Sequence, residues 1–575
     1  MHRRWVLREP AAEARGSISR ASGVSGLAAS VLAARGIVEP EAVGAFLHPS
    51  LANLPDPSLL PGMDAAVGRL ARAAEAGETV WVYTDYDVDG VTAAAVLGEF
   101  LRACRIPVRV RLPRRDREGY GLHPSALREI AEEGGTLVVT ADCGVNAVEA
   151  GRAARELGID LVVTDHHSPG DALPEAVAVV NPKLPASSYP DPSIAGVGVA
   201  WNLAAALRRR LREAGHFGSG GEPDLREALG LVALGTVADM APLRDVNRVL
   251  VSRGLRALNR SPRAGIRALR EVARVKGELR AGHLGFQLGP RLNAAGRMEG
   301  PQEALDLLQT GDPDRARALA QRLDRLNQER REEERGILGQ AVERVEAEGW
   351  HPGRWSLAVE SEGWHAGVVG IVASRLVERY HRPAVVLSVD GGSAKGSARS
   401  VRGLHLCEVL AECGGLLDRF GGHAAAAGLS LPAERVPEFR ECFEAAVRAR
   451  LSEEDLAPVL TLDAEAAFSE LTVEAVRELS RLEPFGVGNP TPVLLSRRVR
   501  LLDVRPLGRD GAHAKLRLEQ GGVRCEALAW RKARELGHAR PGQWVDVAHT
   551  PQVNEWNGVE RVQLVVEGMR PAPSG

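Results

Sequence analysis

Three aspartates at alternate positions, Asp85, Asp87 and Asp89, have the residue types and spacing for chemistry. They follow an apolar run of strand-forming residues at 79–84, and Gly90 and a small-residue segment that predicts a helix come after them. Strand, acidic loop and helix form the first half of a βαβ unit, and open α/β sheets keep their active sites at the carboxyl ends of such strands. Because three crowded carboxylates repel one another unless a cation neutralises them, the spacing indicates a divalent-metal site.

Two other interpretations of this stretch exist. The same spacing opens the calcium loop of a helix-loop-helix protein, but that loop needs a Glu at its twelfth position, where this chain has Val96. It also needs a preceding helix, whereas the residues before Asp85 predict a strand, so we reject the calcium loop. A solvated acidic turn without a ligand remains the alternative for the stretch taken alone.

Later apolar segments end in side chains of the same kinds. Residues 137–140 lead to Asp142, 161–164 to Asp165-His166-His167, 177–180 to Asn181-Pro182-Lys183, and a strand expected within 231–240 leads to Asp239. Repeated ends of this kind in a βα succession converge on one rim of a sheet. Carboxylates with imidazole suit Mn²⁺ or Mg²⁺, with Zn²⁺ also allowed, and the acids suffice for two ions, the usual arrangement for phosphoester hydrolysis.

Size and composition limit the class of protein. A chain of 575 residues holds roughly three or four domains. The 73 basic and 75 acidic residues balance, so any nucleic-acid binding must use local patches. Six cysteines without a CxxC pair favour a reducing compartment, and the sequence has neither an apolar run long enough to span a membrane nor a signal-peptide pattern. We therefore expect a cytoplasmic protein with no membrane contact.

The remaining segments predict further parts of an α/β protein. Asp312-Pro313 is a good helix start, and a helix from there to about Glu348 would span about 55 Å and connect two lobes. Segment 363–375 predicts a turn entering a helix, 395–400 a short turn, and 421–428 the start of another helix. From about residue 495 the apolar period becomes two, which predicts a small β-barrel whose Trp530, Arg531, Lys532 and Trp556 could stack bases and hold phosphates. Core tryptophans in a plain packing domain are the alternative there.

The motifs together resemble those of a known enzyme family. Asp87/Asp89, Asp142, Asp165-His166-His167 and Asp239 resemble the four motifs of the DHH phosphoesterase superfamily. Segments 286–297, 363–370, 395–400, 421–428 and 484–490 resemble those of its RecJ family of single-stranded-DNA-specific exonucleases. Some superfamily phosphatases carry a metal-binding His where this chain has Tyr83, and Asp85 could replace that ligand.

The resemblance implies a fold and a division of the chain. The expected fold class is α/β, with a parallel-sheet DHH domain, a long connector helix, a smaller α/β DHH-associated domain and a carboxy-terminal OB-fold barrel. The expected parts are a helical segment at 1–75, the DHH catalytic domain at 76–260, a helical region with the connector at 261–350, the DHH-associated substrate-binding domain at 351–455, a linker at 456–494 and the OB-fold domain at 495–575.

The resemblance also implies an activity. We expect a 5′→3′ exonuclease on single-stranded DNA that releases 5′-mononucleotides by two-metal-ion hydrolysis with Mn²⁺ or Mg²⁺, and that acts in DNA repair and recombination. The expected partners are single-stranded DNA, a single-stranded-DNA-binding protein and a repair helicase. The expected metal ligands are Asp85, Asp87, Asp89, Asp142, His166 and Asp239, with Asp142 as the bridge between two ions.

Other residues are expected to act on the substrate. His167 would contact the scissile phosphate or protonate the leaving oxygen. Arg115, Arg297, Ser397 and Arg399 would grip the terminal 5′-phosphate, Tyr120 could stack on a base, and His423 would face the substrate phosphate.

Two rival functions remain. One is a nanoRNase or cyclic-dinucleotide phosphodiesterase of the same superfamily. The predicted barrel is evidence against this function, because those enzymes usually lack such a barrel. The other is a catalytically inactive replication scaffold, which should have lost several of the acids that this chain retains.

Overall fold

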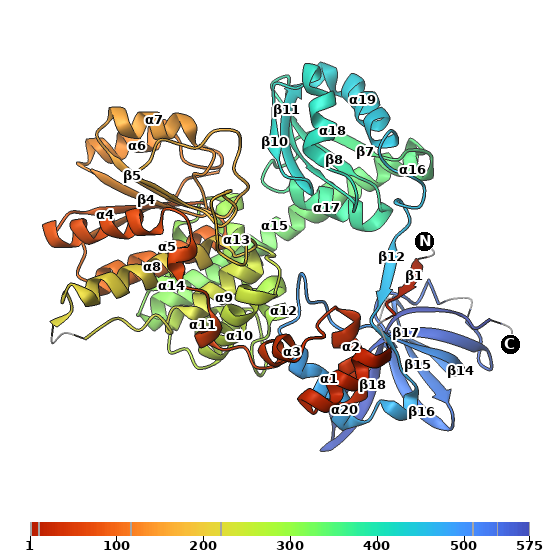
Figure 1. Cartoon of the computed structure of the whole chain (residues 1–575). Helices are drawn as coiled ribbons and strands as arrows, with labels where there is room; N and C mark the ends of the chain where they lie inside the picture. The colour runs from red at the N-terminus through yellow and green to blue at the C-terminus, as the bar shows by residue number, and fades with distance from the viewer. Residues whose placement is uncertain are drawn as a thin grey trace.

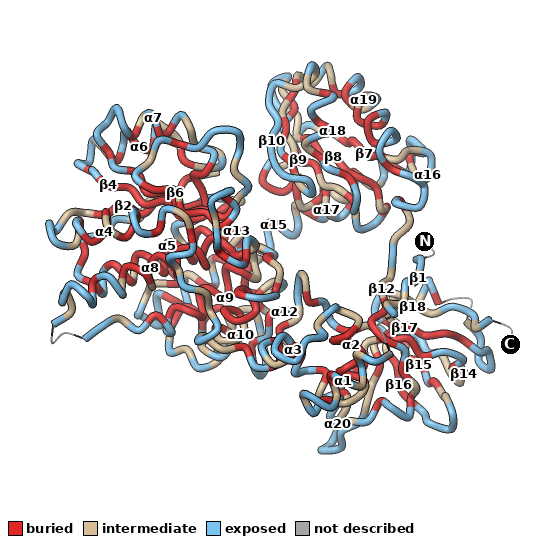
Figure 2. The backbone as a smooth tube through the Cα atoms, in the orientation of Figure 1, coloured by how far each residue is buried: buried red, intermediate tan, exposed pale blue. Residues whose placement is uncertain are grey.

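The computed structural model describes residues 3–9, 12–115, 118–218, 221–508, 511–536 and 539–573. The chain forms three bodies placed roughly at the corners of a triangle, and its amino-terminal helices lie against the carboxy-terminal body (Figure 1). Buried residues run through the middle of each body (Figure 2). None of the helices in these ranges is long and apolar enough to cross a membrane.

A parallel sheet forms the centre of the first body. Its strands lie in the order β3-β2-β4-β5-β6. Their bounds are Val108–Arg111 (β3), Val80–Thr84 (β2), Leu137–Ala141 (β4), Asp160–Thr164 (β5) and Ala178–Val180 (β6). β2 and β4 are buried along their whole length, as parallel strands covered on both faces should be. The apolar runs of the sequence predicted β2, β4, β5 and β6, whereas β3 at the edge of the sheet is the alternating segment VRVR.

Helices cover both faces of this sheet. One face packs on α4 (Met63–Ala76), α5 (Val88–Ala103) and α8 (Gly196–Glu213), and the other on α6 (Pro124–Glu132) and α7 (Val148–Glu156). Along β2, Val80 and Val82 enter the first layer while Trp81 and Tyr83 enter the second. This alternation follows from the two-residue period of a strand.

A set of helices extends the first body on the α5 and α8 side. Their bounds are Leu229–Ala238 (α9), Asp245–Asn259 (α10), Ala264–Val272 (α11), Ala281–His283 (α12), the π-helical turn Leu284–Leu288 (η4), Gly289–Met298 (α13) and Gln302–Gln309 (α14). The strand predicted within 231–240 is therefore wrong, because these residues form α9. All of 229–236 is buried, and periodicity cannot distinguish a fully buried helix from a buried strand.

The long connector helix is confirmed as α15, Pro313–Ala347. Asp312 caps its amino end by accepting a hydrogen bond from the Asp314 amide. Ala316 to Leu326 supply apolar residues to the core of the first body, and Ile337, Ala341 and Val345 belong to a core of the second. One helix of about 52 Å therefore contributes to both cores.

The second body has a mixed sheet in the order β10-β11-β9-β8-β7, in which only β7 and β8 are parallel. Its elements are the short helix Trp350–Gly353 (α16), Leu357–Glu362 (β7), Val369–Tyr380 (α17), Ala384–Asp390 (β8), Ser393–Arg399 (β9), Leu406–Glu412 (α18), Arg419–Gly422 (β10), Ala426–Pro432 (β11) and Val436–Arg448 (α19). Cys413 and Cys442 form a disulfide here, a pairing that cysteine spacing does not reveal.

Two local predictions fail in this body. Segment 395–400 is not a turn, because its residues up to Arg399 belong to β9, and 421–428 is a β10–β11 hairpin rather than the start of a helix. Both segments consist mostly of Gly, Ala and Ser, so pairing with neighbouring strands decides their structure. The predicted turn into a helix at 363–375 is correct and gives α17.

The third body is a closed β-barrel. The strands are Ala464–Glu465 (β13), Leu494–Leu507 (β14), His513–Gln520 (β15), Val523–Ala529 (β16), Trp544–Trp556 (β17) and Val559–Pro571 (β18), and β14 pairs with β17 to close the barrel. Helix α20 (Val473–Leu479) and the amino-terminal helices α1 (Ala12–Ser22), α2 (Gly26–Ala34) and α3 (Pro40–Leu47) share its core.

The amino-terminal segment thus packs on the carboxy-terminal barrel rather than standing apart. Strand β1 (Arg4–Leu7) pairs in parallel with β12 (Val459–Leu462), the strand that enters the barrel from the second body. The sequence analysis missed this association, because nothing in residues 1–75 indicates which distant segment buries their apolar faces.

Candidate metal centre and substrate cleft

The first part of the site is the loop between β2 and α5. Asp87 caps α5, since its Oδ1 accepts hydrogen bonds from the amides of Asp89 (2.9 Å) and Gly90 (3.1 Å). A Cβ at Gly90 would lie 2.3 Å from the Asp85 carbonyl oxygen, so only glycine fits there. The tight turn directs three carboxylates toward the carboxyl rim of the sheet.

Asp89 is held by the amino end of α8. Its two oxygens accept hydrogen bonds from the amides of Gly196 (2.7 Å) and Val197 (2.9 Å). Free amides and the helix dipole stabilise a negative charge at such an end. The position of this buried carboxylate is therefore fixed by the backbone.

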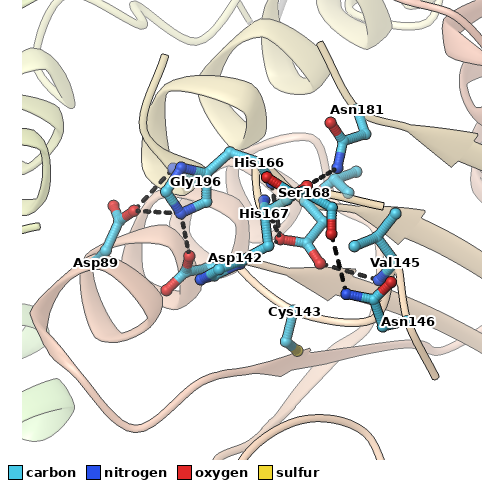
Figure 3. Close-up of polar contacts among 12 residues, drawn as sticks. Asp89, Asp142, Cys143, Val145, Asn146, His166, His167, Ser168, Asn181 and Gly196 are labelled. Carbon is cyan, nitrogen blue, oxygen red and sulfur yellow. Dashed lines mark hydrogen bonds and ion pairs between the residues drawn. The ribbon is translucent and has the colours of Figure 1, made fainter. Parts of the chain in front are cut away.

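Asp142 and His166 form the middle of the cluster (Figure 3). His166 Nε2 lies 3.0 Å from an Asp142 oxygen and 3.9 Å from an Asp89 oxygen, and His166 Nδ1 lies 4.0 Å from Asp239. Although α9 is a helix, Asp239 is its C-cap, and the helix end brings this side chain to the same rim as the strand ends.

The candidate ligands fall into overlapping groups. Asp85, Asp87 and Asp142 have ligand atoms within 4.8 Å of one another, and so do Asp89, His166 and Asp239. A third group joins Asp142 to His166 and His167. All six predicted metal ligands thus lie in one cluster, and the contact between Asp142 and His166 joins its two halves.

The electrostatics of the cluster require a counter-charge. Burial and the neighbouring Asp87 raise the pKa of Asp85 well above its usual value, and burial with Asp89 does the same for Asp142. Burial and Asp87 raise the pKa of Asp89 to about 7, and burial and Asp89 raise that of Asp239 to about 9. Burial and His167 lower the pKa of His166 to about 3, so its imidazole is neutral and can be a ligand.

Three buried atoms of the cluster also make no hydrogen bond within the described chain. They are Asp85 Oδ1, Asp142 Oδ1 and His166 Nε2. Buried polar atoms normally have partners. Hard oxygen donors with one imidazole are a donor set for Mn²⁺ or Mg²⁺, so the residues present fit such ions.

The metal-free protein should lose stability as pH rises. The raised pKa values mean that the folded protein keeps protons on Asp89 and Asp239 that the unfolded chain releases near pH 4, so unfolding releases protons between about pH 4 and pH 9. In EDTA the melting temperature should therefore fall across this range. An ion that binds only the folded state adds about 2.7 kcal/mol at a hundred times its Kd.

Thermal melts at pH 5.5 to 9 in EDTA and in Mn²⁺ measure both effects. We expect Mn²⁺ to raise the melting temperature, and more at pH 8 than at pH 6. If Mn²⁺ does not raise the melting temperature, or raises it more at pH 6 than at pH 8, these carboxylates do not hold the ion.

His167 lies between the metal cluster and the neighbouring cleft. Its Nδ1 is 2.7 Å from Asp165 Oδ1, and Asp165 also accepts hydrogen bonds from the amides of Val145 and His166. Burial lowers the pKa of His167, but the hydrogen bond to Asp165 and the negative charges of Asp165, Asp87 and Asp89 together outweigh burial and raise it. The sequence analysis gave Asp165 no role of its own, although its place directly before the His pair is the signal for one.

The predicted substrate residues line the junction of the first two bodies. A cleft of about 860 Å³ is bordered by Arg115, Tyr120, His167, Ser397, Arg399 and His423. The ring of His423 stacks on that of His167, with 5.8 Å between centroids. The Tyr120 hydroxyl is 3.1 Å from the nitrogens of His167. An adjoining cleft of about 940 Å³ adds Arg297.

Three arginines in these clefts differ from most others in the chain. Within the described ranges no carboxylate forms a salt bridge with Arg115, Arg297 or Arg399; Arg297 donates to the Gly367 carbonyl (3.2 Å) and Arg399 to that of Ala398 (2.8 Å). Burial and Arg115 lower the pKa values of both Arg297 and Arg399. Arginines that repel one another and have no carboxylate partner at a cleft form a site for an anion.

The barrel carries a separate groove of about 1240 Å³. It is lined by Lys515, Arg517, Arg524, Arg561 and Trp556, together with Glu526. Lys515 is paired with Glu526, Arg517 with Asp503 and Arg524 with Glu519. Trp556 is 75% exposed, so the interpretation of a core tryptophan is wrong for it.

Trp530 and Trp556, which the sequence analysis named together as base-stacking candidates, lie at different places on the barrel. Glu526 of β16 pairs with Gln563 of β18, which places Trp530 and Trp556 at opposite ends of these strands. The Lys532 ammonium is already bonded to Glu567 (2.8 Å).

Comparison with known proteins decides the family. The DHH family N-terminal domain matches residues 79–236, the DHHA1 domain 355–449 and the RecJ OB domain 462–568. The single-stranded-DNA-specific exonuclease RecJ of Bacillus subtilis is 39% identical over 567 residues, which cover 98% of this chain and 70% of that protein. RecJ of Dickeya dadantii is 41% identical over 541 residues, 91% of this chain and 93% of that one.

The chain belongs to the RecJ family. The crystal structure of RecJ in complex with Mn²⁺ from Thermus thermophilus has a TM-score of 0.85 at 32% identity, and covers 99% of this chain and 80% of that chain. The complex with Mg²⁺ from the same organism has a TM-score of 0.79 at 30% identity, and covers 99% of this chain and 79% of that chain.

The structure gives segment 286–297 a physical role that its sequence did not reveal. Asn293 Oδ1 accepts a hydrogen bond from the Val88 amide (3.0 Å), and a Cβ at Gly296 would lie 2.6 Å from the Tyr86 carbonyl oxygen. Helix α13 therefore packs directly on the acidic loop. These two residues position the loop rather than contact a ligand.

Proposed function

We propose that this chain is a single-stranded-DNA-specific exonuclease that degrades DNA from the 5′ end and releases 5′-mononucleotides, using two Mn²⁺ or Mg²⁺ ions. The observation that supports it most is the continuity of the acidic cluster with the arginine-lined cleft through His167, in a chain of the RecJ family. The cluster suits hydrolysis of a phosphodiester, and the cleft suits the end of a strand.

The ligands of the ions are Asp85, Asp87, Asp89, Asp142, His166 and Asp239, with Asp142 between the two halves. When bound, the ions stabilise the charge that develops on the phosphate and activate water as the nucleophile. Asp89 is fixed by the amino end of α8 and Asp87 by the turn that it caps, so the donors are positioned before any ion binds.

His167 supplies the proton for the leaving oxygen. Asp165 orients its ring and, by raising its pKa, favours the protonated form that can donate a proton. Release of a 5′-mononucleotide breaks the bond between phosphorus and the O3′ atom of the terminal nucleotide. His167 borders both the cluster and the cleft where that nucleotide lies.

The cleft binds the 5′ end. Arg115, Arg297 and Arg399 have the charge for a terminal phosphate, and Ser397 adds a hydroxyl donor from β9. Tyr120 offers a half-exposed ring for the terminal base, and His423 faces the phosphate from the second body.

The barrel groove binds a part of the strand that is farther from the 5′ end. There Trp556 stacks on a base between cationic side chains. We place the enzyme in the cytoplasm, in DNA repair and recombination, with a single-stranded-DNA-binding protein and a repair helicase as its partners.

The rival functions have less support. A nanoRNase or cyclic-dinucleotide phosphodiesterase has no evident use for a domain of the RecJ OB type at 462–568. An inactive scaffold has no reason to keep six ligands in one cluster beside arginines without acid partners.

Strands labelled at the 5′ or the 3′ end test the proposal. Single-stranded DNA, duplex DNA and short RNA are incubated with Mn²⁺, Mg²⁺ or EDTA. We expect mononucleotides from the 5′ label at the earliest times, with the single strand preferred over the duplex, and no product in EDTA. First release from the 3′ end, or a preference for dinucleotides, would contradict it.

A further inference from the structure

The cleft of about 940 Å³ that contains Arg297 holds more positive charge than one terminal phosphate uses. Both bodies contribute nitrogen-bearing side chains to it: Arg115, Arg297, His365, Lys395 and Arg419. Within the described ranges no carboxylate forms a salt bridge with Lys395 or Arg419. Glu299 also borders the cleft, but its carboxylate is paired with Arg322 (2.6 Å). The proposed function leaves Lys395 and Arg419 without a partner.

The sheet of the second body places these two cations in one row. On β9, Lys395, Ser397 and Arg399 share the face turned away from the core, while the alternate alanines are buried in it. Lys395 pairs with Ser430 of β11, and Ser430 pairs with Arg419 of β10. An ammonium, a hydroxyl and a guanidinium therefore stand side by side across three strands. β10 and β11 form the side of this body that is nearest to the first body (Figure 1).

This row lies directly beyond the proposed position of the terminal phosphate. Ser397 is two residues from Lys395 along β9, a distance of roughly 7 Å. The neighbours of Ser397 across the sheet are Gly428 and Gly421, and all three residues border both clefts. Because the two glycines have no side chains, the surface of the sheet beside Ser397 stays open toward Lys395. The space for the 5′ end therefore continues to the second row of donors.

His365 adds a hydrogen-bond donor to the same cleft. Its Nδ1 accepts a hydrogen bond from the Gly367 amide (3.0 Å), so the ring proton is on Nε2 and can be donated at the border of the cleft. The Gly367 carbonyl in turn accepts a hydrogen bond from Arg297 (3.2 Å). One turn thus holds both the imidazole and the guanidinium at this cleft.

We propose that this cleft binds the second and third phosphates of a polyphosphate chain on the 5′ carbon of a strand, so that the enzyme accepts 5′-triphosphorylated ends. The inference rests on the proposed exonuclease function. A triphosphate carries more negative charge than a monophosphate, and Lys395 and Arg419 are the kinds of side chain that bind phosphate oxygens. Ser430 and His365 supply neutral donors between and beside them.

Cleavage of such an end uses the same chemistry as the proposed function. The oxygen of water bonds to the phosphorus of the second nucleotide, the bond from that phosphorus to the O3′ atom of the first nucleotide breaks, and O3′ takes a proton. The first product is then a nucleoside triphosphate. The remaining strand begins with a 5′-monophosphate, and the following products are mononucleotides.

The test compares two DNA strands of one sequence that begin with a 5′-monophosphate or a 5′-triphosphate and carry a tritium label in the first base. With Mn²⁺, the wild type should cleave both, with a kcat/KM on the triphosphate strand at least as high as on the other. Chromatography should show a labelled deoxynucleoside triphosphate as its first product. The double variant Lys395→Gln/Arg419→Gln should lower the ratio of kcat/KM on the triphosphate strand to that on the monophosphate strand roughly tenfold or more.

Two further variants make the assignment specific. Lys395→Arg keeps the positive charge and should keep the wild-type ratio. Arg210→Gln removes an exposed guanidinium near the end of α8 that borders neither cleft, and should leave both rates unchanged. An unchanged ratio in the double variant would overturn the proposal, and so would a wild type that leaves the triphosphate strand uncut.

A free nucleoside triphosphate carries the same polyphosphate chain as the strand end. We therefore also measure how dATP and dAMP inhibit cleavage of the monophosphate strand at constant free Mn²⁺. If dATP inhibits strongly while the triphosphate strand is not cleaved, the cleft takes free nucleotides and the strand-end assignment is wrong.

Failure of this inference differs from failure of the proposed function. If the wild type releases the first nucleotide of the monophosphate strand but not of the triphosphate strand, only the polyphosphate site is refuted. If it does not cleave the monophosphate strand from its 5′ end, the proposed function fails, and the polyphosphate site with it.

Discussion

Asp142→Asn should lower the rate of DNA cleavage at least ~10³-fold, because the carboxylate that links the two halves of the cluster positions both ions. Asparagine keeps the shape of a side chain that has no spare room, since a Cβ at Gly196 would lie 2.7 Å from it. DNA binding should weaken much less, because the cationic contacts of the cleft and the barrel remain. Cleavage is measured on a 5′-labelled single strand in Mn²⁺, and binding by fluorescence anisotropy in Ca²⁺.

Two controls show whether the loss of cleavage comes from the metal cluster and not from misfolding. Asp314→Asn changes an 89% exposed carboxylate on α15 and should leave the rate unchanged. The metal-free Asp142→Asn protein should melt no lower than the wild type, because burial disfavours the charge that the variant removes. A variant that keeps more than a tenth of the wild-type rate would exclude Asp142 as the link between the ions.

Arg399→Ala should selectively damage recognition of the 5′ end. Arg399 ends β9, borders the cleft and has no salt bridge within the described ranges, so its guanidinium is available for a terminal phosphate. Losing two charge-assisted hydrogen bonds costs about 1.5–3 kcal/mol. This corresponds to a fall in kcat/KM of roughly 10–100-fold on a 5′-phosphorylated strand.

A double cycle isolates this interaction. Wild type and Arg399→Ala are each measured on 5′-phosphate and 5′-hydroxyl strands, and the loss should be small on the hydroxyl end, where the partner is already missing. Arg399→Lys keeps the positive charge but not the planar guanidinium, so its kcat/KM on the 5′-phosphate strand should lie between those of the wild type and Arg399→Ala. The same loss on both ends would mean that Arg399 supports the second body or binds an internal phosphate.

Much of the fold and the site could be predicted from local patterns. Four strands of the first sheet, β2, β4, β5 and β6, follow from apolar runs, and runs of that kind give buried parallel strands. The start of α15 is marked by Asp312 and Pro313, a cap and a first-turn residue that act locally. The rule that strand ends share a rim was sufficient to group Asp85, Asp87, Asp89, Asp142 and His166.

The errors come from interactions between distant segments. Residues 229–238 are apolar on all sides because α9 is buried among other helices, and no local signal separates that helix from a strand. Segments 395–400 and 421–428 become strands through pairing with each other and with β8. The separation of Trp530 from Trp556 depends on the register of the barrel strands.

Anomalous diffraction at the manganese edge tests the central claim most directly. Crystals of the wild type grown with Mn²⁺ should give two peaks among Asp85, Asp87, Asp89, Asp142, His166 and Asp239, with Asp142 coordinating both ions. Crystals of Asp142→Asn should lose at least one of these peaks. A single wild-type peak, or two peaks that persist in the variant, would contradict a two-ion centre linked by Asp142.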